Sequence, residues 1–200
     1  MFESRLKDEI MIESGCSIAM DKDDECMISK VLYALGEVYR NDYFLVENNC
    51  HELSIVGSFY RYFRNEYDDY FNSNFPGVSI DMEYSKMGEE LCAKPAPTND
   101  MGKKHMRIDF VVHKRKCQTQ NLLAIEFKLK GRKKDINWDY DKLKAITVKA
   151  DDVSQVRNYE LGISALLKDD GVEMRFFKDG KERCSLPYKW NGRILENVKA

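Results

Sequence analysis

The sequence has no long hydrophobic run and no large excess of either charge. Its apolar stretches are far shorter than the roughly 20 residues that a membrane-spanning helix needs, so we expect no membrane segment. The first fifteen residues carry acids where a signal peptide has an apolar core, which favours a cytoplasmic protein. The 34 acidic and 32 basic residues give a formal net charge of −2, so the chain as a whole is no obvious binder of polyanions.

The sequence also lacks any CxxC pair, although it contains 6 cysteines. This excludes the common zinc-knuckle and thioredoxin motifs. In a cytoplasmic protein we expect reduced thiols that serve as small buried or surface residues. A zinc site remains an alternative that the spacing disfavours, and its ligands would come from Cys50, His51, Cys92, His105, His113 and Cys117.

Basic residues are concentrated in one segment. Between residues 103 and 134 there are eleven lysines and arginines and only two acids, whereas the rest of the chain is acidic. Such a segment is typical of a surface that contacts a phosphate backbone. A solvated, lysine-rich hairpin explains the charge equally well. The candidate nucleic-acid contacts are Lys103, Lys104, Arg107, Lys114, Arg115, Lys116, Lys130, Arg132, Lys133 and Lys134.

Apolar periodicity predicts an α/β protein in which helices flank a mixed central sheet in three layers. We expect an N-terminal helical extension over residues 1–49 and a main domain over residues 50–200. An exposed loop at 94–103 and an irregular basic C-terminal end are also expected. The predicted helices are 26–40, 51–63 continuing to about residue 70, 139–146 and 151–159, and the predicted strands are 78–84, 106–113, 122–130, 161–168 and 171–178.

Two of these strands carry acids at their centres. Asp109 and Glu126 lie on neighbouring strands of an expected hairpin, and Lys128 shares the face of Glu126 because side chains alternate along a strand. If the register places both acids on one face, they can share a divalent ion with the main-chain carbonyl of Phe127. Oxygen ligands of this kind suit Mg²⁺ or Mn²⁺.

A third acid lies on a helix that precedes these strands. Glu52 falls on the apolar stripe of the 51–63 helix, and a carboxylate on a buried face needs a compensating partner. The metal site or Lys128 would supply that partner. Alternatively, Glu52 and an N-cap residue at Asn49 form a capping box, and the two interpretations are compatible.

The arrangement of Asp109 followed seventeen residues later by Glu126-Phe127-Lys128, after a helix with Glu52, resembles the PD-(D/E)xK nuclease superfamily. The resemblance covers about residues 50 to 168 and implies a restriction-endonuclease-like fold, with a helix, three antiparallel strands, a helix and a further strand. It implies that Asp109 and Glu126 are metal ligands, that Lys128 is the catalytic lysine and that Glu52 completes the site. Ile108 stands where the motif has proline, a position that varies in the family.

The resemblance thus predicts a Mg²⁺- or Mn²⁺-dependent endonuclease or exonuclease, a hydrolase that binds DNA and cuts its phosphodiester bonds. RNA remains open as a substrate, and many nucleases of this fold act as homodimers. The alternative is a module of the same fold that binds nucleic acid or protein without cleaving, and a structural zinc protein ranks third. A binding module has no need for the complete set of two acids and a lysine.

Overall fold

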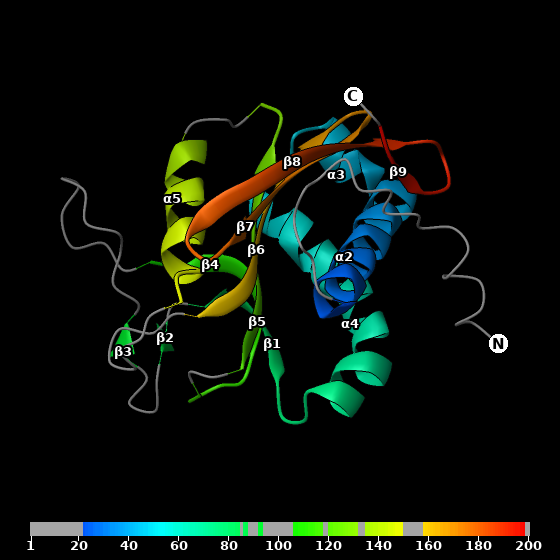
Figure 1. Cartoon of the computed structure of the whole chain (residues 1–200). Coiled ribbons are helices and arrows are strands. Elements are labelled where there is room, and N and C mark those ends of the chain that lie inside the picture. The colour runs from blue at the N-terminus through cyan, green and yellow to red at the C-terminus, as the bar shows by residue number, and fades with distance from the viewer. Residues whose placement is uncertain are drawn as a thin grey trace.

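The computed structural model describes residues 22–84, 86–87, 92–93, 106–117, 120–131, 135–149 and 158–198. The protein is a mixed α/β structure with helices on both faces of a central sheet (Figure 1). The helices are α2 (Lys22–Asn41), α3 (Tyr43–Glu47), α4 (Glu52–Asn74) and α5 (Ile136–Ile146). The strands are β1 (Ser79–Tyr84), β2 (Lys86–Met87), β3 (Cys92–Ala93), β4 (Ile108–His113), β5 (Asn121–Leu129), β6 (Tyr159–Lys168), β7 (Gly171–Lys178), β8 (Lys181–Trp190) and β9 (Leu195–Asn197).

The central sheet has seven strands in the order β1-β4-β5-β6-β7-β8-β9. The β5–β6 pair is parallel, and every other neighbouring pair in this sheet is antiparallel. Parallel neighbours need a crossover connection, and α5 lies in the chain between β5 and β6. The short strands β2 and β3 form a separate antiparallel pair.

The main hydrophobic core lies between the sheet and the helices α2 and α4. Residues of α4 at helical spacing, among them Ile55, Phe59 and Phe63, form its buried stripe. The ring of Phe59 lies 4.9 Å from that of Phe110 on β4 and 5.0 Å from that of Phe127 on β5. These aromatic contacts fix α4 across the two strands that carry the predicted acids.

Helix α2 belongs to the same core. Its Asp24 is only 1% exposed and forms an ion pair with Lys178 of β7. The hydroxyl of Tyr39 donates to the carbonyl of Lys168 at 2.7 Å and so ties the helix to the end of β6. The predicted boundary between residues 49 and 50 falls in the turn between α3 and α4, and it stays a prediction.

Helix α5 covers the opposite face of the sheet. Its Leu143 and Ile146 belong to a second cluster of buried residues, together with Val111 of β4 and Ala124 of β5. The even-numbered residues near the middle of β5 therefore face α5, whereas Ile125 and Phe127 face the main core. This alternation decides on which side Glu126 lies.

The main helices and strands expected from periodicity are observed, but the C-terminal expectation was wrong. Residues expected to be irregular form β8 and β9. In β8 only Leu186 and Tyr188 are buried, and charged residues and a proline obscure the alternation, so its pairing with β7 defines this strand. The predicted loop at 94–103 lies outside the described residues, as does most of the predicted 151–159 helix. Its last residue, Tyr159, begins β6.

Two further expectations concern membranes and cysteines. Among the described helices, none is long and apolar enough to cross a membrane. Cys26, Cys50 and Cys117 carry reduced thiols, as expected. Cys184 is disulfide-bonded, which departs from the expectation that all cysteines are reduced.

Candidate active site

The strand register brings the two predicted acids to the same face. Pairing of β4 with β5 includes Val111↔Ala124 and Phe110↔Ile125, so the next pair in this register is Asp109 opposite Glu126. Side chains directly opposite each other in an antiparallel pair point to the same side of the sheet. Glu126 is 1% exposed and lies beneath α5, at the second buried cluster.

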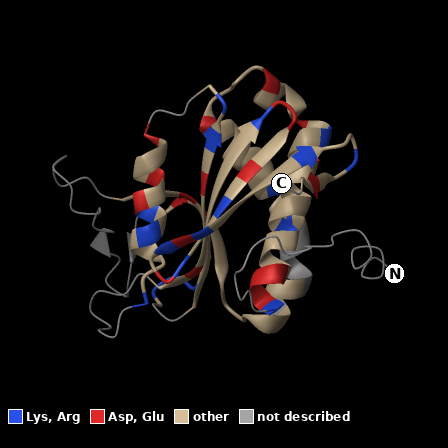
Figure 2. Ribbon diagram, turned by 45° about the horizontal axis from the view of Figure 1, so that its top comes forward, with Lys and Arg blue, Asp and Glu red and all other residues tan. Residues whose placement is uncertain are grey.

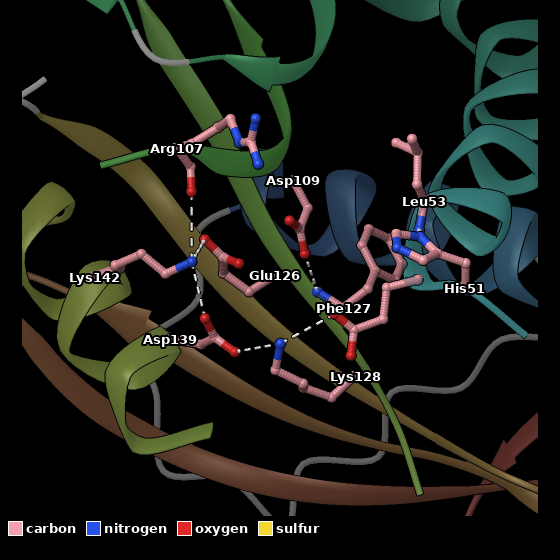
Figure 3. A network of polar contacts seen from close by, with 10 residues as sticks. His51, Leu53, Arg107, Asp109, Glu126, Phe127, Lys128, Asp139 and Lys142 are labelled. Carbon is pink, nitrogen blue, oxygen red and sulfur yellow. Dashed lines mark hydrogen bonds and ion pairs between the residues drawn. The ribbon is translucent and has the colours of Figure 1, made fainter. Parts of the chain in front are cut away.

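Asp109 also replaces part of the backbone ladder between these strands. Its Oδ2 accepts a hydrogen bond from the backbone N–H of Phe127 at 2.9 Å, two residues beyond the last matched pair (Figure 3). The N–H and C=O of one strand residue point to the same side. We therefore expect the Phe127 carbonyl to face the side of Asp109 as well, where the sequence predicted a main-chain ligand.

Helix α5 adds two charged residues to this centre. The ammonium of Lys142 lies 2.7 Å from Oε1 of Glu126 and 2.8 Å from Oδ1 of Asp139 (Figure 3). The other oxygen of Asp139, Oδ2, lies 3.0 Å from the ammonium of Lys128. Asp139 thus links the two lysines, and both of its oxygens are engaged.

Lys128 is held from a second side by Glu52, whose Oε2 lies 3.2 Å from its ammonium. Glu52 is the first residue of α4, in the helical layer on the other face of the sheet. Its contact with Lys128 lies past the last hydrogen-bonded pair of β4 and β5, Phe110 and Ile125. The expected N-cap at Asn49 is wrong, because His51 caps α4 and its Nδ1 accepts from the N–H of Leu53 at 3.2 Å.

Four carboxyl groups and two ammonium groups therefore meet in one network, with a formal excess of two negative charges. Glu126, Asp139 and Lys142 are buried in it, and the other three residues are partly exposed. Burial raises the pKa of Asp109, and burial together with the neighbouring Asp109 raises the pKa of Glu126 well above its usual value. For Lys128, burial opposes the charge, but the carboxylates of Asp139 and Glu52 outweigh it and raise the pKa. Glu126 and Asp139 raise the pKa of Lys142 in the same way.

The donors of this network fit a hard divalent cation. Oε1 of Glu126 and Oδ2 of Asp139 are buried at ion-pair distance from lysines, yet neither makes a well-directed hydrogen bond within the described structure. Buried carboxylate oxygens without well-directed hydrogen bonds, beside a Glu126 whose pKa is raised, favour an additional cation. As the side chains lie, no three His, Cys, Asp or Glu residues of the described ranges are grouped around one metal position.

The predicted basic segment does not form one surface in the described part of the chain. Arg107 lies two residues before Asp109 and Lys130 two residues after Lys128, whereas Lys114, Arg115 and Lys116 lie in the turn at the far end of β4. Five residues of strand separate the two groups by about 16 Å. Figure 2 shows acidic and basic residues interspersed over the described helices and strands. The other predicted contacts, Lys103, Lys104, Arg132, Lys133 and Lys134, lie outside the described residues.

Several of these cations already have acidic partners. Arg107 pairs with Glu83 at 3.4 Å, and Lys130 pairs with Asp169. Each pair is partly exposed, so each is weak and open to exchange with another anion. The charges alone therefore do not distinguish a phosphate-binding surface from a solvated hairpin.

A second charged cluster lies on the same face of the sheet, at β1 and β4. Oδ2 of Asp81 lies 2.9 Å from Nε2 of His113 and accepts from Nε of Arg115 at 2.8 Å. His113 is 3% exposed and packs against the ring of Tyr84, with centroids 4.2 Å apart. Burial opposes the charge of Asp81, but Arg115 and His113 outweigh it and lower the pKa. His113 was a candidate zinc ligand, and its observed partner is this carboxylate.

Sequence reasoning missed Asp139 and Lys142. A readable signal was present, because Asp139, Lys142, Leu143 and Ile146 are spaced as the buried stripe of a helix. Two opposite charges on such a stripe indicate a buried ion pair rather than a solvated face. Only the structure shows that this pair meets Glu126 and Lys128.

Comparison with protein-family models, with curated proteins and with solved structures finds no match for this chain. The site is therefore interpreted from its own geometry and chemistry.

Proposed function

We propose that the chain is a metal-dependent nuclease that hydrolyses phosphodiester bonds. The observation that carries the proposal is the convergence of Asp109, Glu126, Lys128 and Glu52, from three separate elements, in one network. An ion cluster that only stabilises the fold needs no excess of acidic groups at its centre. A site that binds a divalent cation together with a phosphate needs such an excess.

The order of the elements supports a restriction-endonuclease-like core. Helix α4 is followed by three antiparallel strands, β1, β4 and β5, then by α5 and by β6, which runs parallel to β5. This is the order that the sequence resemblance implies. The strands β7, β8 and β9 extend the sheet beyond that core.

Asp109, Glu126 and the Phe127 carbonyl would hold Mg²⁺ or Mn²⁺, and the ion would lower the pKa of a bound water and neutralise charge on the scissile phosphate. Glu52 and Asp139 position the ammonium of Lys128 beside these ligands. The pKa of Lys128 is raised, so it stays protonated at neutral pH and cannot act as a general base. Its role is to orient the attacking water and to stabilise negative charge on the phosphate.

DNA is the substrate class to test first. Arg107, two residues before Asp109, and Lys130, two residues after Lys128, are exposed and can contact flanking phosphates without reading sequence. Their present partners, Glu83 and Asp169, are weak enough to be exchanged. A homodimer, in which each site cuts one strand, stays a prediction.

The test is cleavage of plasmid and single-stranded DNA by wild type and by Lys128→Ala, with Mg²⁺, with Mn²⁺ and with EDTA. We expect metal-dependent cleavage that the substitution abolishes. Lys144→Ala is the matched control, because Lys144 is partly exposed on α5 and pairs only weakly, with Asp141 at 3.6 Å. Equal cleavage by wild type and Lys128→Ala would point to a contaminant and reject the role of Lys128.

The alternative is a non-catalytic binding module on the same fold. The observation that favours it is the ion network itself, in which both lysines already have carboxylate partners. This alternative predicts that Mg²⁺ and Mn²⁺ leave the melting temperature unchanged and that no DNA or RNA is cut. A shift of the melting temperature by Mn²⁺ would argue against it.

A further inference from the structure

Lys142 has a place that the proposed chemistry does not use. It is 7% exposed, and its ammonium lies within reach of oxygens from three parts of the chain: Glu126 on β5 and Asp139 on its own helix at ion-pair distance, and the carbonyl of Arg107, to which it donates at 3.4 Å. An ammonium has three protons to donate, and three acceptors surround this one (Figure 3). A lysine so enclosed is poorly placed to contact a substrate.

Its contact with Glu126 is the decisive one. Glu126 is a proposed metal ligand, and Lys142 lies 2.7 Å from its Oε1. In sites with two metal ions, the ions lie about 3.5–4 Å apart and share such acids. An ammonium at this distance from Oε1 occupies the side of the carboxylate where a second ion would bind.

The charges of the network lead to the same conclusion. Four carboxyl groups face two ammonium groups, so one divalent cation balances the network, whereas two would leave an excess of positive charge. Asp139 holds Lys142 in place by an i,i+3 ion pair at 2.8 Å on the same helix.

We propose that Lys142 is a positioning residue that takes the place of a second metal ion, so that the site binds one divalent cation per chain. The inference rests on the proposed function, since it takes Asp109 and Glu126 as metal ligands. It extends that function by setting the metal stoichiometry and by assigning this role to a helix residue outside the predicted motif.

The test is calorimetric titration of the full chain with Mn²⁺, without nucleic acid. Wild type is expected to bind one Mn²⁺ per chain. Lys142→Met keeps the length of the side chain but removes its charge, and it is expected to bind two Mn²⁺ or to bind one at least tenfold more tightly. Lys144→Met, on the exposed side of the same helix, is expected to match wild type.

Two results would overturn the inference alone: two Mn²⁺ ions on wild type, or Mn²⁺ binding by Lys142→Met that equals wild type in number and affinity. Wild type without any bound Mn²⁺ would reject the proposed function together with the inference. The number of Mn²⁺ ions bound by wild type is measured without the variant. It therefore tests the inference even if Lys142→Met fails to fold.

Discussion

Two clusters of charged side chains lie on the α5 side of the sheet, and they differ in balance. At β1 and β4, the carboxylate of Asp81 is enclosed by His113 and Arg115, and its pKa is lowered. At β4 and β5, Asp109 and Glu126 lie just beyond the paired residues Phe110 and Ile125, and the pKa values of both acids are raised. In the first cluster the positive charges outweigh the cost of burying the acid. In the second cluster they do not outweigh this cost for Asp109 and Glu126.

We infer that the difference separates a structural cluster from a candidate functional one. A cluster that only joins two strands is most stable when each buried charge has a partner, as around Asp81. The centre at Glu126 keeps more acids than cations in a site where burial makes unbalanced charge costly. Perturbed acids in such a centre are candidates for function, whereas a lowered pKa in a closed ion pair indicates stability.

The largest expected effect is on catalysis. Glu126→Gln removes one proposed metal ligand, so cleavage of DNA is expected to fall on the order of 10²-fold or more. Asp81→Asn, in the balanced cluster, is expected to leave the cleavage rate near that of wild type. Initial rates on plasmid DNA measure both. A similar loss in the two variants would remove the distinction between the clusters.

The next effect is stabilisation by a divalent cation. Mn²⁺ at one hundred times its dissociation constant is expected to stabilise the native state by about 2.7 kcal/mol. Glu126→Gln should lose most of this effect, and Asp81→Asn should retain it. Thermal melts with Mn²⁺ and with EDTA provide the comparison. A Mn²⁺ shift that survives Glu126→Gln would place the cation elsewhere.

A comparable or smaller effect is expected on metal-free stability. Asp81→Asn leaves the buried His113 without its ion pair, and we expect a loss of about 1–3 kcal/mol. Glu126→Gln removes a charge that its surroundings disfavour, so at pH 8 in EDTA it should cost less than Asp81→Asn. Urea unfolding at pH 8 measures both free energies. The opposite ranking would show that Lys142 fully compensates Glu126.

The remaining effect concerns pH. Because folding raises the pKa of Asp109 and Glu126, the folded state binds more protons than the unfolded state above about pH 4. In EDTA, stability should therefore fall as pH rises from 4.5 toward 7, by up to about 1.4 kcal/mol per pH unit for each group.

The two clusters differ in this pH window as well. Folding lowers the pKa of Asp81, so its contribution is complete above about pH 4 and is lost only at more acidic pH. Melting curves in EDTA should show a smaller slope for Glu126→Gln than for wild type. A wild-type melting temperature that rises steadily over this range would contradict the raised pKa values.

The sequence was sufficient for those parts of the centre that depend on local alternation. Glu126 and Lys128 share a face because strand side chains alternate, and the amphipathic pattern predicted both strands. The proximity of Asp109 and Glu126 depends on the register between β4 and β5. The sequence did not determine this register, so the shared site was predicted only on the condition that the register allowed it. Asp139 and Lys142 were missed because the position of α5 over β5 is a tertiary feature, although their spacing on the helix was readable.

Other differences have similar physical causes. The basic segment suggested one surface, but a strand separates its charges by its length, and the turn at Lys114 points away from the acids. Strand β8 was missed because only two of its residues are buried, so pairing with β7 rather than its own pattern defines it. A count of charges along the sequence does not show that residues at the two ends of one strand lie far apart in space.

The hydrogen bond from the Phe127 N–H to Asp109 makes one amide proton a reporter of the centre. Its resonance in a ¹⁵N-labelled chain will respond when the carboxylate gains a proton or a cation. The state of the site can then be followed residue by residue, in solution and without any substrate, even in variants that have lost all cleavage.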